Sequence, residues 1–113
     1  MVRIGNMVIN VTDVHRAAEF WGGALGYVPR SEGSLILVPP DGRDGPGVAL
    51  DETDRTHLDL YAADAQEQQA EVERLIGLGA ERVADWPYPD DPDFVVLADP
   101  DGNVFCVVDA SHT

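Results

Sequence analysis

The stretch Asp99–Asp109 reads DPDGNVFCVVD and joins a tight turn directly to a strand. The Pro, Gly and Asn among its first five residues favour a sharp chain reversal. The apolar run that follows is rich in residues that prefer strands. A shorter copy lies upstream, where PDG at 40–42 precedes GVALD at 47–51. We therefore predict a turn and a closing strand that occur twice in the chain.

A second pair of segments extends this repeat. Asn6–Asp13 (NMVINVTD) and His57–Asp64 (HLDLYAAD) both resemble strands, end in Asp and lead into a helical pattern. The two segments are offset by 51 residues at both ends. The chain therefore divides into two modules, 1–52 and 56–110, each predicted to run strand–helix–strand–strand–strand. At 113 residues, we expect both modules to form a single domain, 1–113.

Capping residues and apolar spacing define the elements of each module. Asp13 is expected to cap a helix whose apolar stripe ends before Gly26. Asp64 and Glu67 have the spacing of a capping box for the second helix, which we expect to include Gly79 on its apolar face. Strands are expected over residues 4–11, 27–32, 34–38, 48–51, 57–62, 81–85, 94–98 and 104–108.

The composition narrows the classes of partner. With 21 acidic and 7 basic residues the net charge is −14, and no basic cluster is present, so we expect no nucleic-acid partner. No apolar run approaches the ~20 residues of a membrane helix, so we expect no membrane partner. The single Cys106 excludes an internal disulfide and fits the reducing cytoplasm. The acidity would either attract cationic small molecules or simply maintain solubility.

Alternation along the strands separates two faces. His57, Asp59 and Tyr61 share one face of their strand and are expected to point away from the helix. Asn6, Val8 and Asn10 should do the same in the first module, as should Cys106 in the last strand. These residues make a face too polar for a core and too apolar for plain solvent. A curved sheet that shelters such a face forms a ligand cleft.

Three segments carry a resemblance to a known family: INVTDVHRAAEFWGGALGY at 9–27, HLDLYAAD with GLGAERV, and the closing DPDGNVFCVVD. They resemble the vicinal oxygen chelate superfamily, the glyoxalase, bleomycin-resistance and extradiol-dioxygenase group, and its glyoxalase-like branch in particular. The resemblance implies an α+β fold in which two βαβββ modules form curved mixed sheets around a cleft. It also implies a homodimer. This fold hosts enzymes and passive binders alike.

The resemblance also marks where metal ligands would stand. The family's metal enzymes place a His or Gln early on each first strand and a Glu in the last strand of each module. Asn6 and His57 occupy the first pair of positions here, and Cys106 stands where those enzymes have Glu. The remaining position falls near Val48–Leu50, where no side chain can ligate. We therefore expect no metal and no cofactor.

A zinc alternative remains open, because His57 and Cys106 could hold zinc if Asp59 or Asp51 joined them. His57 is either a hydrogen-bonding group in the cleft or a structural residue at a strand start. Asp59 is either solvated or paired with His57, Arg3, Arg55 or a cationic ligand.

Each of the other candidate residues also has two possible roles. Cys106 is either a small buried apolar residue or a reactive thiol. Trp86 and Tyr88, in a Pro-rich loop, either form stacking walls for a flat ligand or cover the edge of the core. The candidate ligand-binding residues are therefore Asn6, Val8, His57, Asp59, Trp86, Tyr88 and Cys106, with the catalytic residues unassigned.

The leading functional hypothesis is a metal-free binding protein that sequesters a small organic ligand, such as an antibiotic or another flat or cationic compound. The alternative is a lyase, isomerase or dioxygenase-like enzyme of the glyoxalase family that acts on a small oxygenated substrate. His57 would then be the general base, assisted by Cys106 or Asp59. A third hypothesis is an interaction module whose cleft is vestigial.

Overall fold

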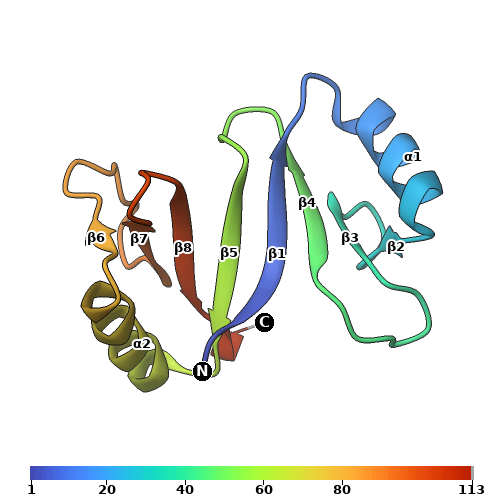
Figure 1. Ribbon diagram of the computed structural model, residues 1–113. Coiled ribbons are helices and arrows are strands. Elements are labelled where there is room, and N and C mark those ends of the chain that lie inside the picture. Colours follow the sequence, from blue (N-terminus) through green and yellow to red (C-terminus); the bar gives the residue numbers. More distant parts are fainter. Residues whose placement is uncertain (113) are drawn as a thin grey trace. The chain divides into compact units, whose positions relative to one another are not determined.

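The computed structural model describes residues 1–112 and divides into two compact units. The first unit is Gly5–Thr56, and the second unit combines residues 1–4 with 57–112. Both follow the order strand–helix–strand–strand–strand, which confirms the predicted α+β fold of two βαβββ modules (Figure 1). β1 (Arg3–Asn10) begins in the second unit and continues through the first. The grouping of both modules in one domain stays a prediction.

The first unit contains α1 (Val14–Leu25), β2 (Val28–Pro29), β3 (Ile36–Val38) and β4 (Gly47–Asp51). Its strands are ordered β2-β3-β4-β1, with β1 and β4 parallel and the other pairs antiparallel. The apolar stripe of α1 packs against a buried cluster on β3 and β4, made of Leu37, Val48 and Leu50. Ile9 and Val11 join this cluster, so Asn6 and Val8 lie on the opposite face of β1, as predicted.

The ends of α1 are fixed by the residues that the sequence indicated. The Asp13 carboxylate accepts hydrogen bonds from the backbone N–H groups of His15 and Arg16, both at 3.1 Å. Gly26 adopts a positive φ of 69°, and its N–H donates to the carbonyl of Gly22. Both predicted caps are confirmed, although Leu25 at the end of the stripe is 45% exposed.

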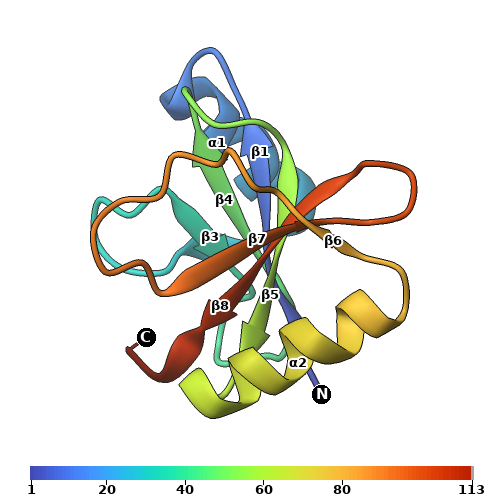
Figure 2. The same ribbon diagram turned by 90° about the vertical axis from the view of Figure 1, so that its left-hand side faces the viewer.

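The second unit contains β5 (His57–Ala62), α2 (Ala65–Gly77), β6 (Glu81–Arg82), β7 (Phe94–Ala98), β8 (Val104–Asp109) and a 3-10 turn, Ala110–His112. Its strands are ordered β5-β8-β7-β6, and β5 and β8 are parallel. α2 packs against β5 and β8, and Figure 2 shows it at the lower end of β5. It contributes Val72 to a core cluster with Ala80, Leu97 and Val107. This cluster defines which face of β8 is buried beneath the helix.

α2 begins as predicted and ends earlier. Its cap residue Asp64 accepts from the Glu67 N–H at 2.8 Å, while the Glu67 carboxylate accepts from the N–H of Ala63. Gly79 is not on the helix: with φ +118° it follows the last turn, and its N–H donates to the carbonyl of Ile76. The Ala80 N–H donates to Leu75, which completes a Schellman motif.

The edge strands are shorter than predicted. β2 spans only Val28–Pro29, because proline lacks an N–H for the ladder and a turn at Gly33 follows, with φ +75°. β6 spans Glu81–Arg82, although the Val83 N–H still reaches the carbonyl of Val96 at 3.2 Å. No helix in residues 1–112 is long and apolar enough to cross a membrane.

The turn before β8 is held by the Asp99 carboxylate. Its Oδ1 accepts from the backbone N–H groups of Asp101 and Asn103, at 3.0 and 2.8 Å, and its Oδ2 accepts from the Asn103 side chain. The Asn103 side chain, followed by these backbone donors, holds the pKa of Asp99 below its ordinary value. Gly102 supplies the positive φ of 86°. The predicted turn is confirmed, and it fixes the start of β8.

Candidate functional site

Three chemically active side chains meet on one face of β5 and β8. Asp59 and Cys106 are Cα partners in the parallel ladder, so their side chains point to the same face. His57 precedes Asp59 by two residues and shares that face. Its Nε2 lies 3.3 Å from Asp59 Oδ1, and the ligating atoms of all three residues lie within 4.8 Å of one another. We call these residues the His57–Asp59–Cys106 cluster.

The packing of β8 explains why the cluster forms where it does. Val107 is completely buried and packs with Val72 of α2, so the strand alternation turns Cys106 to the face away from the helix. The sequence predicted this face for all three residues. The cluster is well enclosed, with the side chains of His57 and Asp59 only 6% and 20% exposed and Cys106 6% exposed.

The cluster combines a base, an acid and a thiol. Imidazole accepts and releases protons near neutral pH, and a neighbouring carboxylate stabilises its protonated form. Of the partners proposed for Asp59, the structure places His57 beside it. Arg3, another of those partners, holds its guanidinium carbon 5.4 Å from the centre of the Tyr61 ring, in a cation–π contact.

Tyr88 holds its loop against β7. Its hydroxyl oxygen accepts from the buried backbone N–H of Val96 at 2.6 Å, and its ring lies 5.4 Å from that of Phe94. The half-buried Trp86 precedes it and accepts the Tyr88 N–H through its carbonyl. These contacts favour the core-edge interpretation of Tyr88, and ligand binding by either aromatic residue stays a prediction.

The remaining sequence candidates lie in the first unit. Asn6 and Val8 are both buried. Gly47 is the Cα partner of Asn6, and a Cβ on it would collide with Asn6 Oδ1. Asp51 accepts from the N–H groups of Thr53 and Asp54 at 2.7 and 2.8 Å, so its carboxylate closes the turn after β4. Asp59 is therefore the carboxylate of the cluster.

A buried carboxylate on α2 was not singled out by the sequence. Glu71 is 6% exposed, and its Oε1 accepts from the Val2 N–H at 2.6 Å and from Arg74 Nη2 at 3.1 Å. The hydrogen bonds from Arg74, and to a smaller extent the one from Val2, lower the pKa of Glu71 to about 2. The spacing of Glu71 and Arg74, three residues apart on a helix, was the available signal. Its role is structural, because it fastens the start of the chain to α2.

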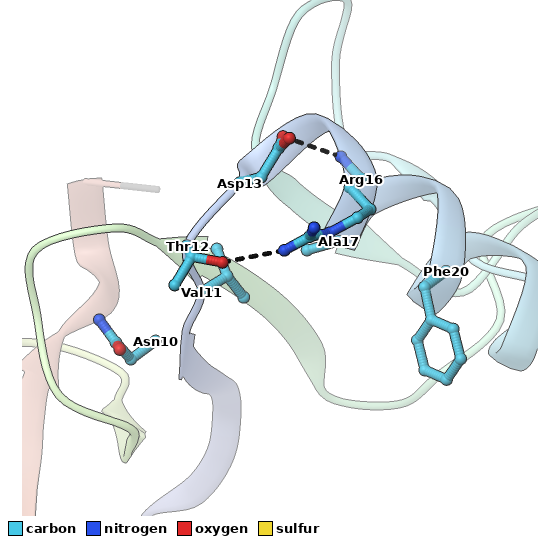
Figure 3. A pocket seen from close by; sticks show the side chains of 7 residues that line it. All are labelled: Asn10, Val11, Thr12, Asp13, Arg16, Ala17 and Phe20. Carbon is cyan, nitrogen blue, oxygen red and sulfur yellow. Dashed lines mark hydrogen bonds between the residues drawn. The ribbon is translucent and has the colours of Figure 1, made fainter.

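A cavity of about 430 Å³ opens at the start of α1 (Figure 3). The N–H groups that an anion would use there are already occupied by two carboxylates, because Glu52 accepts from Val14 and Asp13 accepts from His15 and Arg16. The guanidinium of Arg16 donates to Thr12 Oγ1 at 2.9 Å. This cavity is a second candidate binding place, lined by Asn10, Val11, Thr12, Asp13, Arg16, Ala17 and Phe20.

The donor atoms of the cluster are of the types that bind metal ions in proteins. Imidazole nitrogen, thiolate sulfur and carboxylate oxygen are the three donor types found around zinc in proteins. A zinc site that retains an open position needs three protein ligands, which is the number the cluster supplies. The oxygen-rich ligand set preferred by magnesium, calcium or manganese is not what these three side chains provide.

A model of the glyoxalase-like domain family matches residues 6–108. No curated protein sequence gives a significant match. Among solved structures, methylmalonyl-CoA epimerase from Mycobacterium tuberculosis is 17% identical with a TM-score of 0.58, covering 94% of this chain and 86% of its own.

Two further solved structures have the same fold. The methylmalonyl-CoA epimerase of Streptomyces coelicolor, in complex with 2-nitronate-propionyl-CoA, is 18% identical with a TM-score of 0.57 and covers 97% of this chain and 99% of its own. A hypothetical protein from Bacillus halodurans C-125 is 14% identical with a TM-score of 0.57, covering 99% and 96%. With the family match over nearly the whole chain, this protein belongs to the glyoxalase-like domain family of the vicinal oxygen chelate superfamily.

Proposed function

We propose that the chain is an isomerase- or lyase-type enzyme that moves a proton on a small oxygenated substrate, with His57 as the proton acceptor. The observation that carries this proposal is the His57–Asp59 pair, 3.3 Å apart with the imidazole only 6% exposed. An enclosed imidazole beside a carboxylate is an arrangement that favours general base catalysis.

The proposed step uses only groups of this chain. The imidazole of His57 accepts a proton from the carbon next to a carbonyl, and the C–H electron pair forms the C=C bond of an enolate. Asp59 orients the imidazole and stabilises its positive charge. The Cys106 thiol, within 4.8 Å of both, donates a hydrogen bond to the enolate oxygen. In a 2-hydroxy aldehyde or ketone, His57 then returns its proton to the former carbonyl carbon while the 2-hydroxyl proton passes to the enolate oxygen, which gives the isomer and restores the base.

The comparisons support this proposal over the sequestration of an antibiotic. Methylmalonyl-CoA epimerases recur among the solved neighbours, and an epimerase moves a proton at a carbon. At 17–18% identity they support the reaction class rather than the substrate. The resistance-type binding that the acidic composition favoured has no corresponding support among them. We also keep the homodimer as a proposal, with light scattering as its check against the single-chain mass of 12.2 kDa.

Proton exchange with solvent tests the proposal even where the product is unidentified. Methylmalonyl-CoA, 2-hydroxy ketones, 2-hydroxy aldehydes and 3-oxo acids would be incubated with the protein in D₂O. Proton NMR would then follow loss of the signal next to the carbonyl. We expect accelerated exchange for at least one compound, falling by about 10²–10⁴-fold in His57→Ala.

The exposed His15 gives a matched control, because His15→Ala removes an imidazole from α1 and should leave exchange unchanged. Circular dichroism confirms that each variant is folded. Exchange in no compound of the panel, or equal exchange in wild type and folded His57→Ala, would contradict the proposal.

A further inference from the structure

We infer that the His57–Asp59–Cys106 cluster is a zinc-binding site in which Cys106 supplies a thiolate. This site lies on β5 and β8 of the second unit alone and uses Asp59 and Cys106. The metal enzymes that the chain resembles do not ligate at the Asp59 position, and they have a carboxylate where Cys106 stands. The inference therefore reverses the expectation, drawn from missing ligands, that the chain binds no metal.

The spacing of the three side chains fits a tetrahedral ion. Zinc lies about 2.0–2.3 Å from nitrogen, oxygen and sulfur ligands, which places neighbouring ligand atoms roughly 3.3–3.6 Å apart. His57 Nε2 and Asp59 Oδ1 are already separated by 3.3 Å. The Cys106 sulfur lies within 4.8 Å of both, so a small side-chain rotation completes the triangle.

The charges also balance. A zinc ion carries two positive charges, and the Asp59 carboxylate and the Cys106 thiolate carry one negative charge each. An enclosed neutral complex avoids the cost of burying a net charge. On binding, the Cys106 S–H bond breaks, its electron pair forms the sulfur–zinc bond, and the proton leaves to solvent. The fourth position of the ion stays open to water or to a substrate oxygen.

Zinc binding and the proposed proton transfer compete for one imidazole ring. Nε2 faces Asp59, so the substrate proton would go to Nδ1. Once Nε2 ligates zinc, Nδ1 carries the proton of the neutral ring and cannot accept another. Zinc in this site would polarise a substrate oxygen as a Lewis acid and would leave the proposed base unavailable. This consequence rests on the proposed function, whereas the binding itself does not, so the two are measured separately.

Cobalt titration of the full chain tests the binding directly. The protein is purified without a His-tag, freed of metal with a chelator and titrated with Co²⁺, which replaces zinc and is coloured. Because Cys106 is the only cysteine, any thiolate-to-cobalt charge-transfer band in the near ultraviolet reports that one sulfur. We expect the band to saturate at one equivalent and to disappear when Zn²⁺ is added, whereas Mg²⁺ leaves it unchanged.

Variants then assign the ligands. Cys106→Ser should abolish the band, and His57→Ala and Asp59→Asn should each weaken cobalt binding by at least about 100-fold, more than the loss of a supporting partner would cause. His15→Ala should bind as the wild type does. The wild-type band needs no variant to fold, so its absence at saturating Co²⁺ overturns the inference. The inference would also be overturned if folded Cys106→Ser still bound one equivalent of Co²⁺ as tightly as the wild type, because the ion would then occupy an adventitious site elsewhere.

The two proposals fail in different readouts. A cobalt band without solvent exchange in any compound would uphold the zinc site and contradict the proposed enzyme. Exchange without a band would do the reverse. If both occur, zinc at one equivalent should suppress exchange at least 10-fold, and undiminished exchange in the zinc-loaded protein would contradict the shared use of His57.

Discussion

The two units have the same order of elements and differ in what their parallel strand pairs carry. In the first unit, Val8 is the Cα partner of Ala49, and in the second unit Asp59, offset from Val8 by 51 residues, is the partner of Cys106. Asn6 occupies the position that corresponds to His57. One frame therefore holds an apolar pair and the other an acid, a thiol and an imidazole. The comparison shows that the βαβββ frame fixes positions and that the residues placed there decide the chemistry.

The largest effect on stability is expected when a residue of the second unit is placed at the corresponding position of the first. Val8→Asp places the residue of the second unit at a buried position of the first, where Asn6 stands in place of His57. An uncompensated buried charge should lower the free energy of unfolding by about 3–5 kcal/mol, measured by urea denaturation. Val8→Thr, which has nearly the same shape and no charge, should cost much less. A loss below 1 kcal/mol for Val8→Asp would show that this face tolerates charge in both units.

Removing the charge from the second unit should affect activity. Asp59→Asn keeps the size of the side chain and removes the negative charge beside His57. We expect solvent exchange to slow by about 10–100-fold, because the imidazole loses the group that orients it and stabilises its protonated form. Asp85→Asn, an exposed residue of the same unit, is the matched control. Equal rates of solvent exchange in both variants would show that Asp59 has no part in the reaction.

Two glycine substitutions test how tightly the buried Asn6 side chain is packed in the first unit. Gly47→Ala should lower the free energy of unfolding by about 1–3 kcal/mol, because its Cβ would collide with the buried Asn6 side chain. Gly23 lies within α1, where a Cβ would meet nothing within 4 Å, so Gly23→Ala should raise stability by up to about 1 kcal/mol. Thermal unfolding of both variants gives the signs, and destabilisation by both would point to a general intolerance of alanine.

The Glu71 network gives the second unit its own dependence on pH. The pKa of Glu71 is lowered from its ordinary value of 4.5 to about 2. Its contribution to stability is therefore fully present above pH 4.5 and is lost as the pH falls towards 2. We expect Glu71→Gln to lose less stability than wild type across that window, in urea titrations at each pH. Glu73→Gln, on the same helix and exposed, should keep the wild-type slope, and identical slopes for all three would contradict this role.

The sequence was sufficient for the frame and for the faces of the strands. Asp13, Gly26, Asp64 and the closing turn at Asp99 are local signals, because each acts through hydrogen bonds to residues within a few positions. Alternation then placed the cluster residues on one face. The distances between the cluster side chains could not be predicted, because the pairing of Asp59 with Cys106 depends on a register between strands about 50 residues apart in sequence. The Tyr88 bond to Val96 was missed because it depends on how the Pro-rich loop folds back against β7.

The place where a substrate binds decides whether the His57–Asp59–Cys106 cluster is the functional site. The compound from the exchange panel that reacts fastest would be titrated into ¹⁵N-labelled protein, and the shifts of backbone and imidazole signals would be recorded. We predict that the largest shifts fall on β5 and β8, with the His57 imidazole and the Cys106 amide among them. Shifts gathered instead around the cavity at Thr12, Arg16 and Phe20 would contradict it, and would move the functional site to the first unit.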